Sequence, residues 1–381
     1  MKLTCKQQDL AKGLSTVSHA VSTRTTLPIL SNILLVAEGD RVRLSATNLE
    51  VAITCWVPAN IQEEGSTTAP AKLLAEFVSA LPPADVKLEM ADGSLALKVS
   101  SQRSHATIRG MDPSEFPGIP TGDVGEQSVT LDAAELRQLI KEVDFAAATD
   151  DARPVFTGVL TRVRNERLTM AGADSFRLAV ATADLPGAPD QADVLIPARA
   201  LSELGRILPA EGSATMTVTT NHNQALFRAG DAEMVTNLIA GQFPNFEAIL
   251  PKSHATRVTL PADQFKQAAK TATLFARDSA NIVRLKVETG EPGGLTPGVI
   301  TLQATADELG DTTTTIEEAA VDGSGMEIIF NVKYLTDVLN VLDTPQVALE
   351  LNSPQSPGVI RPVGERGEQY TYVIMPMHNT R

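Results

Sequence analysis

Cysteine is nearly absent from this chain of 381 residues, which contains only Cys5 and Cys55. Two thiols form at most one bridge, whereas a secreted protein stabilised by disulfides carries more. We therefore expect two reduced thiols in a cytosolic protein. Long apolar runs are absent as well: the sequence turns polar directly after Met1, and no later stretch approaches the ~20 apolar residues of a membrane span. These absences predict a cytoplasmic protein that has no membrane partner.

Aromatic residues and positive charge are also scarce. Aromatics make up 4% of the chain against 43% hydrophobic residues, so its cores must be built from Leu, Val, Ile and Ala. The formal net charge is −14, with 32 Lys and Arg against 46 Asp and Glu. This balance argues against a protein that simply coats nucleic acid, because such binding depends on cations that neutralise phosphates. A role on DNA would require the cations to lie together on one surface.

Sequence patterns of catalysis and metal binding are missing. No phosphate-binding loop ending in Gly-Lys-Ser/Thr, no Gly-x-Ser-x-Gly and no metal-ligand spacing of Cys and His occurs. We interpret the acidic pairs Asp150-Asp151 and Glu317-Glu318 as solvated charge, and expect no catalytic residue, metal or cofactor. An enzyme on a repeated α+β scaffold stays open as an alternative; an adhesive repeat protein is disfavoured. The histidines are dispersed: His19, His105, His222, His254 and His378.

Three stretches of the chain begin alike, which indicates an internal repeat. In each, a short strand pattern precedes a helix pattern, with Leu10, Leu136 and Phe265 at the same place. The predicted strand and helix pairs cover 3–5 and 7–21, 129–131 and 133–147, and 258–260 and 262–276. Further markers recur in order: 46–48, 172–174 and 305–307; 71–73, 198–200 and 332–334; 116–117, 243–244 and 375–376. We predict three domains with the bounds 1–125, 126–254 and 255–381.

Each repeat predicts one helix followed by several strands, twice over. The helix patterns carry apolar stripes, whereas segments such as 42–46, 95–99, 214–219 and 347–351 are rich in alternating or β-branched residues typical of strands. Runs of strands after each helix argue against a doubly wound parallel sheet. The predicted fold class is α+β, with three tandem copies of one domain that each contain two helix-plus-strands halves.

Each of the six predicted helices carries a cation on the side opposite its apolar stripe. Residues two apart on a helix point in roughly opposite directions, because each residue turns the chain by about 100°. Ordinary solvated helix faces would also explain these cations, and acidic residues occur on the same helices. The heaviest acidic stretches, 38–40, 288–291 and 308–322, fall in predicted strands and loops. A mildly basic helical surface could follow a phosphate backbone without reading bases. These cations are Lys12, Lys72, Lys141, Arg199, Arg206, Lys270 and Lys333.

Five motifs complete the repeat, and with them the whole chain resembles the DNA polymerase III beta subunit family, the bacterial sliding clamps. The motifs are Arg24-Thr25-Thr26-Leu27-Pro28-Ile29-Leu30, Asp174-Ser175-Phe176-Arg177-Leu178-Ala179-Val180, Phe243-Pro244-Asn245-Phe246, Phe330-Asn331-Val332, and Tyr372-Val373-Ile374-Met375-Pro376-Met377. The resemblance implies a non-catalytic head-to-tail homodimer that closes a ring around double-stranded DNA. Helices would line the hole, where the helical cations and Arg24 would contact DNA, and an acidic exterior would repel it.

The resemblance also implies a pocket for short peptides of the replicative polymerase alpha subunit, the clamp loader, and other polymerases and repair proteins. Methionine suits such a site because its flexible side chain adapts to varied partners. Core packing of a terminal strand is the alternative explanation for Met375 and Met377. The implied pocket residues are Phe156, Ala173, Ser175, Phe176, Arg177, Leu178, Pro244, Ile249, Val373, Ile374, Met375, Pro376 and Met377.

The implied dimer interface pairs Ala106 and Ile108 of the first domain with Leu274 and Phe275 of the third. Ala106 is smaller than the apolar residue common in the family, which predicts a weaker contact. Two further departures affect the pocket: Ala173 replaces a common threonine, and 378–381 replaces a common Arg-Leu ending. A specialised or inhibitor-tolerant second clamp, with a role in antibiotic resistance, is therefore an alternative function.

Overall fold

The computed structural model describes residues 1–22, 26–90, 94–119, 128–150, 152–219, 223–277, 279–290, 298–306 and 310–377. Six α-helices occur in this described part, one at the start of each predicted half-domain. No helix among the described residues is long and apolar enough to cross a membrane. The first repeat comprises β1 (Lys2–Lys6), α1 (Gln7–Ser18), β2 (Asn32–Glu38), β3 (Arg41–Thr47), β4 (Val51–Glu63), β5 (Gly65–Pro70), α2 (Ala71–Ala80), β6 (Asp85–Met90), β7 (Ala96–Ser101) and β8 (Ser104–Arg109).

The second and third repeats follow the same order of elements. The second comprises β9 (Ser128–Asp132), α3 (Ala133–Val143), β10 (Gly158–Arg164), β11 (Arg167–Ala173), β12 (Arg177–Asp184), β13 (Val194–Pro197), α4 (Ala198–Ile207), β14 (Ser213–Val218), β15 (Gln224–Ala229) and β16 (Ala232–Asn237). The third comprises β17 (Thr256–Pro261), α5 (Ala262–Ala276), β18 (Ile282–Glu288), β19 (Gly298–Ala306), β20 (Gly310–Gly323), β21 (Met326–Asn331), α6 (Val332–Val341), β22 (Gln346–Leu351), β23 (Gly358–Pro362) and β24 (Tyr370–Ile374).

The chain divides into two compact units, and the division runs through the central repeat. One unit contains Met1–Arg137 with Arg199–Leu238, and the other contains Gln138–Ala198 with Ile239–Arg381. Each unit contains one twelve-stranded sheet, in which the strands of an outer repeat are continuous with those of one half of the central repeat. The joins are antiparallel pairs, β4 with β16 in the first unit and β12 with β24 in the second. The sheets therefore cross the predicted domain boundaries.

Strand exchange between half-domains explains where the chain divides. In the central repeat β9 pairs with β14, and β13 pairs with β10, so the first strand of each half pairs with a strand of the other half. In the outer repeats one long strand joins both halves: the 13-residue β4 pairs with β3 and β1, and the 14-residue β20 pairs with β19 and β17. The eight-residue β12 pairs with β11 and β24. The central halves therefore lack the long shared strand that joins the others.

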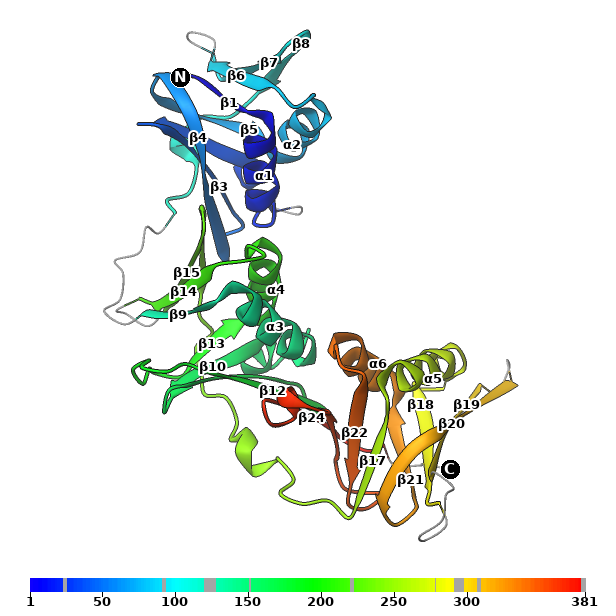
Figure 1. Ribbon diagram of the computed structural model, residues 1–381. Coiled ribbons are helices and arrows are strands. Elements are labelled where there is room, and N and C mark those ends of the chain that lie inside the picture. The colour runs from blue at the N-terminus through cyan, green and yellow to red at the C-terminus, as the bar shows by residue number, and fades with distance from the viewer. Residues whose placement is uncertain are drawn as a thin grey trace. The chain divides into compact units, whose positions relative to one another are not determined.

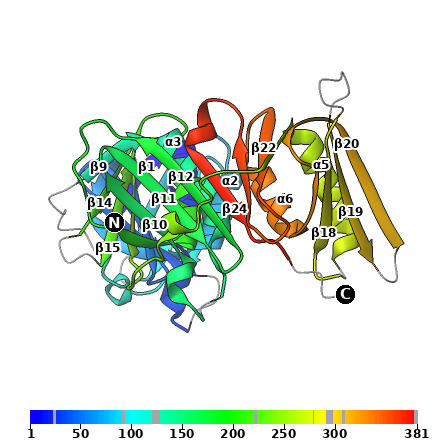
Figure 2. The same ribbon diagram turned by 90° about the horizontal axis from the view of Figure 1, so that it is seen from below.

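The helices cover the buried face of each sheet with their apolar stripes. On α1, Leu10, Leu14 and Val17 are fully buried against β3 and β4. Gly13 allows this close approach, because a Cβ at Gly13 would lie 2.5 Å from Cγ2 of Val57. In the second unit α5 and α6 pack side by side on their strands (Figures 1 and 2). The helices therefore leave their polar sides exposed, as the stripes predicted.

Two predicted helices are shorter than expected. The helix predicted over 7–21 ends at Ser18. The backbone amides of the residues that follow donate to carbonyl oxygens three positions back instead of four, as the amide of Ala20 does to the carbonyl oxygen of Val17 (3.0 Å). The helix predicted over 133–147 ends at Val143 and continues as a 3₁₀ turn, Asp144–Ala146. There β11 passes so close that a Cβ at Gly172 would lie 2.3 Å from the Val143 carbonyl oxygen. Tertiary contact therefore sets the end of α3.

An ion pair with a buried carboxylate fixes α3 to the third repeat within the second unit. Glu142 on α3 is 2% exposed. Its two carboxylate oxygens accept hydrogen bonds from Nε (3.2 Å) and Nη2 (2.7 Å) of Arg366, and one also accepts from Gln138 (2.9 Å). A buried carboxylate that loses its partner keeps the desolvation cost without the attraction that offsets it. This pair is therefore a sensitive point of the fold.

We expect Arg366→Met to lower the free energy of unfolding by about 3 kcal/mol, because it leaves Glu142 buried and unpaired. The measurement is urea unfolding followed by circular dichroism. Arg284→Met is the matched control, since Arg284 pairs with Glu327 where both side chains are well exposed and such pairs contribute at most about 1 kcal/mol. Equal losses in the two variants would contradict the role given to Glu142.

Candidate functional site

The pairing of β12 with β24 brings together the predicted pocket residues on these two strands and at their ends. Arg177 lies opposite Ile374, and Leu178 opposite Val373, in the antiparallel register. The backbone amide of Met375 donates to the carbonyl oxygen of Phe176 (2.8 Å), which extends the pairing beyond β24. The terminal segment is thereby fixed beside the loop between β11 and β12, although the two are some two hundred positions apart in the sequence.

The floor of this site is a buried apolar cluster. Ala173, Leu178 and Val373 are 6%, 4% and 1% exposed and belong to one cluster with Phe246. Phe156, in the 3₁₀ turn Pro154–Thr157, is partly buried and packs against the cluster. The floor therefore combines residues from before β10, from β11, β12 and β24, and from the segment that precedes β17.

Large apolar side chains stand exposed around this floor. Phe176, Ile249 and Met375 are 57%, 48% and 39% exposed. Pro244 is also exposed, whereas Ile374 is fully buried. Phe176 and Met375 are joined by their backbone hydrogen bond, and Ile249 precedes Leu250, which packs against the cluster. Exposed apolar groups beside a buried apolar cluster are typical of surfaces that bind a partner. Met375 therefore lies at the surface, which favours the binding interpretation over core packing for this residue.

Arg177 is largely buried and already paired within the protein. Its side chain is 10% exposed and makes ion pairs with Asp174 (3.0 Å) and Asp337 (2.5 Å). The guanidinium also lies over the ring of Tyr334, 4.6 Å from its centroid. Burial opposes the charge, but Tyr372 and the two carboxylates outweigh it and raise the pKa of Arg177. Arg177 therefore stays charged and holds β12 against α6.

Arg153 connects two walls of the site. Its guanidinium lies over the ring of Phe156, 5.0 Å from the centroid, and donates a hydrogen bond to the hydroxyl of Ser175. Phe156 and Ser175 were both predicted from the sequence, but Arg153 was not. Nothing in its sequence context marks it, because its role comes from the approach of two segments in space. The side chain spans the site above its apolar floor.

Several aromatic residues of the site were also missed. Phe156, Phe243 and Phe246 form a chain of ring contacts, with centroids 6.4 Å apart in each step. Tyr334 of α6 stacks on Phe176, with centroids 6.4 Å apart and 20° between the ring planes. The Phe-Pro-Asn-Phe motif was a usable signal for Phe243 and Phe246, although only Pro244 was taken from it. Ring contacts of this kind hold exposed aromatic groups in place.

A polar hollow of about 740 Å³ adjoins the aromatic side of this site. Arg162 lines it and pairs with Asp193 and Glu247, both at 2.8 Å. Its guanidinium also lies 5.7 Å from the centroid of Phe246. The hydrogen bond to Asp193 is the largest influence on Arg162 and raises its pKa. These contacts fasten the segment that carries Phe243 and Pro244 to β10.

The predicted helical cations are exposed wherever the structure describes them. Lys72 lies 3.9 Å from Glu76, and Arg206 lies 2.7 Å from Glu203, so two of the cations are close to a carboxylate on the same helix. Arg24 lies outside the described residues. The exposed cations are Lys12, Lys72, Arg199 and Arg206 in the first unit and Lys141, Lys270 and Lys333 in the second. Each unit thus presents cations from the solvent side of its helices.

The predicted interface residues lie at an edge of each unit's fold. Ile108 is buried and Ala106 partly exposed on β8, the terminal strand of the first sheet. Leu274 is 59% exposed near the end of α5, and its neighbour Phe275 is partly buried. Among the described residues, no three His, Cys, Asp or Glu side chains lie close enough to hold a metal ion.

Comparisons with known proteins agree over the whole chain. Family models of the DNA polymerase III beta subunit match at residues 1–120 (N-terminal domain), 130–245 (central domain) and 247–378 (C-terminal domain). The beta sliding clamp of Synechocystis sp. is 32% identical over 99% of each chain. The DNA polymerase sliding clamp of Bacillus subtilis has a TM-score of 0.89 at 28% identity, covering 100% of this chain and 99% of that one.

The C. crescentus beta sliding clamp is similar to the same degree, with a TM-score of 0.88 at 31% identity over 100% of this chain and 99% of that one. These matches extend across all three repeats, so they do not depend on a single motif. The chain belongs to the DNA polymerase III beta subunit family, the bacterial sliding clamps, and its function is that of a sliding clamp, a non-catalytic processivity factor of DNA polymerase III.

Proposed function

We propose that this clamp tethers its partners through the site between β12 and β24, and that two copies close a ring around duplex DNA. The observation that carries the tethering is the exposure of Phe176 and Met375, joined by a backbone hydrogen bond, next to the buried apolar residues Leu178 and Val373, with Ile249 exposed beside Leu250 of the same cluster. An extended peptide could bury its apolar side chains on these residues. The partners would be the polymerase alpha subunit, the clamp loader and other polymerases and repair proteins, all in the cytoplasm.

A solved relative supports a ligand role for this family. The sliding clamp of Pseudomonas aeruginosa, 28% identical with a TM-score of 0.89, has been crystallised bound to griselimycin. For this chain we place such ligands at the site of Phe176 and Met375. The alternative of an inhibitor-tolerant copy rests on Ala173 in the floor and on the altered ending, and stays a prediction. The altered ending, 378–381, lies outside the described residues.

Duplex DNA would be followed through its phosphates. Contacts to phosphates position a protein without reading sequence, and the exposed helical cations suit such contacts. The first expected result is topological: clamp loaded on nicked circular DNA survives a wash in high salt but is lost when the same DNA is linearised. Salt strips proteins held only by phosphate contacts. Equal loss from circular and linear DNA would overturn the encircling ring.

The internal repeat suggests how two copies join. The last strand of one half-domain pairs with the last strand of the next repeat twice in this chain, as β4 with β16 and as β12 with β24. The next pair in the series is β20 with β8 of a second copy. Gly310 of β20 corresponds to Ala52 of β4, since Ala306 pairs with Gly310 as Thr47 pairs with Ala52. In this register Ala106 would lie opposite Asp311.

Side-chain contacts extend in the same way. Phe145, near the end of the second repeat's first helix, lies 5.7 Å from Tyr372 between ring centroids. Leu274 holds the position of Phe145 in the third repeat, and Ala106 holds that of Tyr372 in the first. Leu274 of one copy would therefore pack near Ala106 of the other. The pair is smaller than its internal counterpart, which suits an interface weaker than the internal junction.

We expect Leu274→Asp to yield monomers, because burial of a carboxylate against Ala106 and Ile108 is unfavourable. Native mass spectrometry at several protein concentrations measures the change. Ile249→Asp is the matched control: Ile249 is similarly exposed but lies at the pocket, so this variant should stay dimeric. A Leu274→Asp protein that remains dimeric would place the interface elsewhere.

We expect Ser175→Ala and Arg153→Ala to tighten binding of griselimycin, each by about fivefold. Each change removes a hydrogen bond that must break before a ligand enters, and such bonds contribute roughly 1 kcal/mol. Calorimetric titration measures the affinity, with Arg164→Ala as an exposed control in the same unit. Weaker binding in both variants would mean that Arg153 contacts the ligand instead of covering the pocket.

A further inference from the structure

One segment of the second unit supplies two of the predicted pocket residues. This connector, residues 239–250, links the second repeat to the third and carries both Pro244 and Ile249. In Figure 1 it is the yellow-green segment that leads into β17. Its regular structure is limited to the 3₁₀ turn Phe246–Ala248. Because such a segment has few backbone hydrogen bonds, its position depends largely on side-chain contacts.

Apolar contacts anchor the connector at several points. Ile239 and Leu250, at its two ends, pack against the buried apolar cluster that forms the floor of the site. The amide of Ile239 also donates to the carbonyl oxygen of Leu195 (2.9 Å). Phe246 belongs to the cluster itself and is 4% exposed. These contacts place the ends of the connector and its turn.

The stretch in between borders the polar hollow of about 740 Å³. Residues 241–247 of the connector line the hollow together with residues of β10 and with Asp193 and Leu195. Apolar packing is interrupted here, since side chains across a cavity lose their contacts with each other. A side chain that links the connector to the sheet at this place therefore restrains a stretch that packing leaves loose.

Arg162 on β10 makes this link. Its Nη1 donates to Glu247 of the connector (2.8 Å), whereas Nε and Nη2 donate to Asp193 (3.0 and 2.8 Å). The guanidinium also lies over the ring of Phe246. Asp193 thus orients the guanidinium from the side of the sheet, and the remaining edge reaches the connector. The side chain of Arg162 is 22% exposed and that of Glu247 is 64% exposed.

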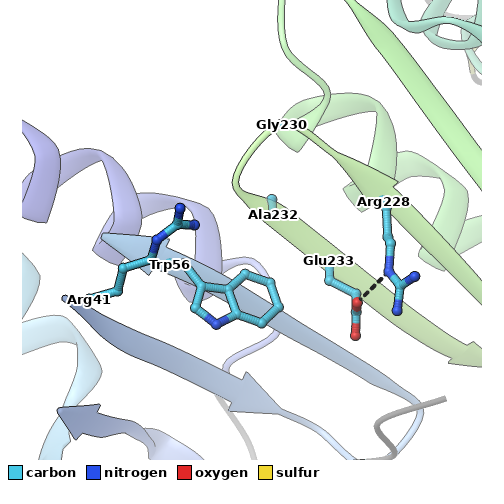
Figure 3. Close-up of a pocket in the computed structure, with 6 residues that line it drawn as sticks. All are labelled: Arg41, Trp56, Arg228, Gly230, Ala232 and Glu233. Carbon is cyan, nitrogen blue, oxygen red and sulfur yellow. Dashed lines mark hydrogen bonds and ion pairs between the residues drawn. The ribbon is translucent and has the colours of Figure 1, made fainter. Parts of the chain in front are cut away.

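An arginine pair beside another hollow shows the difference. At the join of β4 and β16, in the first unit, Arg228 and Glu233 line a hollow of about 320 Å³ together with Trp56 (Figure 3). Nε of Arg228 donates to Glu233 at 2.8 Å. These two residues lie opposite each other on β15 and β16, whose backbones are already paired. That pair adds little to the placement of a segment, whereas Arg162 holds one that lies outside the sheet.

We propose that Arg162 is a positioning residue of the peptide site, which keeps Pro244 and Ile249 in place for a partner peptide through its bond to Glu247. The proposal rests on the proposed tethering at Phe176 and Met375. A site that is already ordered binds more tightly, because the ligand does not have to immobilise it. Ion pairs this exposed contribute little to stability. Loss of the bond should therefore loosen the connector without unfolding the unit.

The test compares Arg162→Gln and Glu247→Gln in the full-length clamp. In both variants the connector should exchange its amide hydrogens faster, while the urea midpoint of unfolding stays unchanged. Griselimycin should bind each about fivefold more weakly in calorimetric titration. The double variant should lose no more affinity than Arg162→Gln alone, because both changes break the same bond. Arg162→Lys, which keeps the charge, should lie between the unmodified clamp and Arg162→Gln.

Arg164→Gln is the matched control. Arg164 lines the same hollow and pairs with the same Asp193 (3.0 Å), so this variant removes an equal charge on the side of the sheet. It should leave both the exchange of the connector and the affinity unchanged.

Three results would overturn the proposal. One is unchanged exchange of the connector in Arg162→Gln, and another is faster exchange with unchanged affinity for griselimycin. The third is an equal effect of Arg164→Gln, which would assign the effect to the charge of the hollow. Failure of the proposed function has a different signature, namely an affinity for griselimycin that Phe176→Ala and Met375→Ala leave unchanged.

Discussion

Backbone pairing between repeats is the constraint on which the functional surfaces of this clamp depend. The bonds between β12 and β24 place Leu178 beside Val373 and so create the pocket floor from distant segments. The bonds between β4 and β16 place Trp56 beside Arg228 in the same way. Strand edges expose amides and carbonyls that bond to water or to another strand, and at these junctions another repeat of the chain supplies the strand. Each junction then acquires side chains that no single repeat contains.

Charged groups at these junctions have two different uses. Glu142 is buried and Arg177 nearly so, and each holds elements together through a partly exposed partner, since removing that partner would leave an uncompensated charge. The helical cations are exposed, and are suited to ligands that arrive from solvent. Burial therefore separates structural from binding charges in a chain where sequence alone makes them look alike.

The threefold repeat also accounts for the proposed pairing of two copies. The two internal junctions are formed by β4 with β16 and by β12 with β24. By the same pattern, β20 of one copy would pair with β8 of a second copy. At the corresponding positions the residues are smaller than the aromatic pair of the internal junction: Ala106 corresponds to Tyr372, and Leu274 to Phe145. A subunit interface built on these smaller contacts would suit a ring that opens to admit DNA.

The sequence by itself determined the repeat, the α+β class, the six helices with exposed cations, and the motifs of the family. These features follow from local periodicity, since stripes of 3.6 or 2 residues fix which side chains can be buried. The sequence did not predict where α1 and α3 end, that Arg177 is buried, or where Arg153, Tyr334 and Trp56 lie. Only the tertiary structure decided these, because each depends on a strand or helix from a distant part of the chain that approaches within a few ångströms.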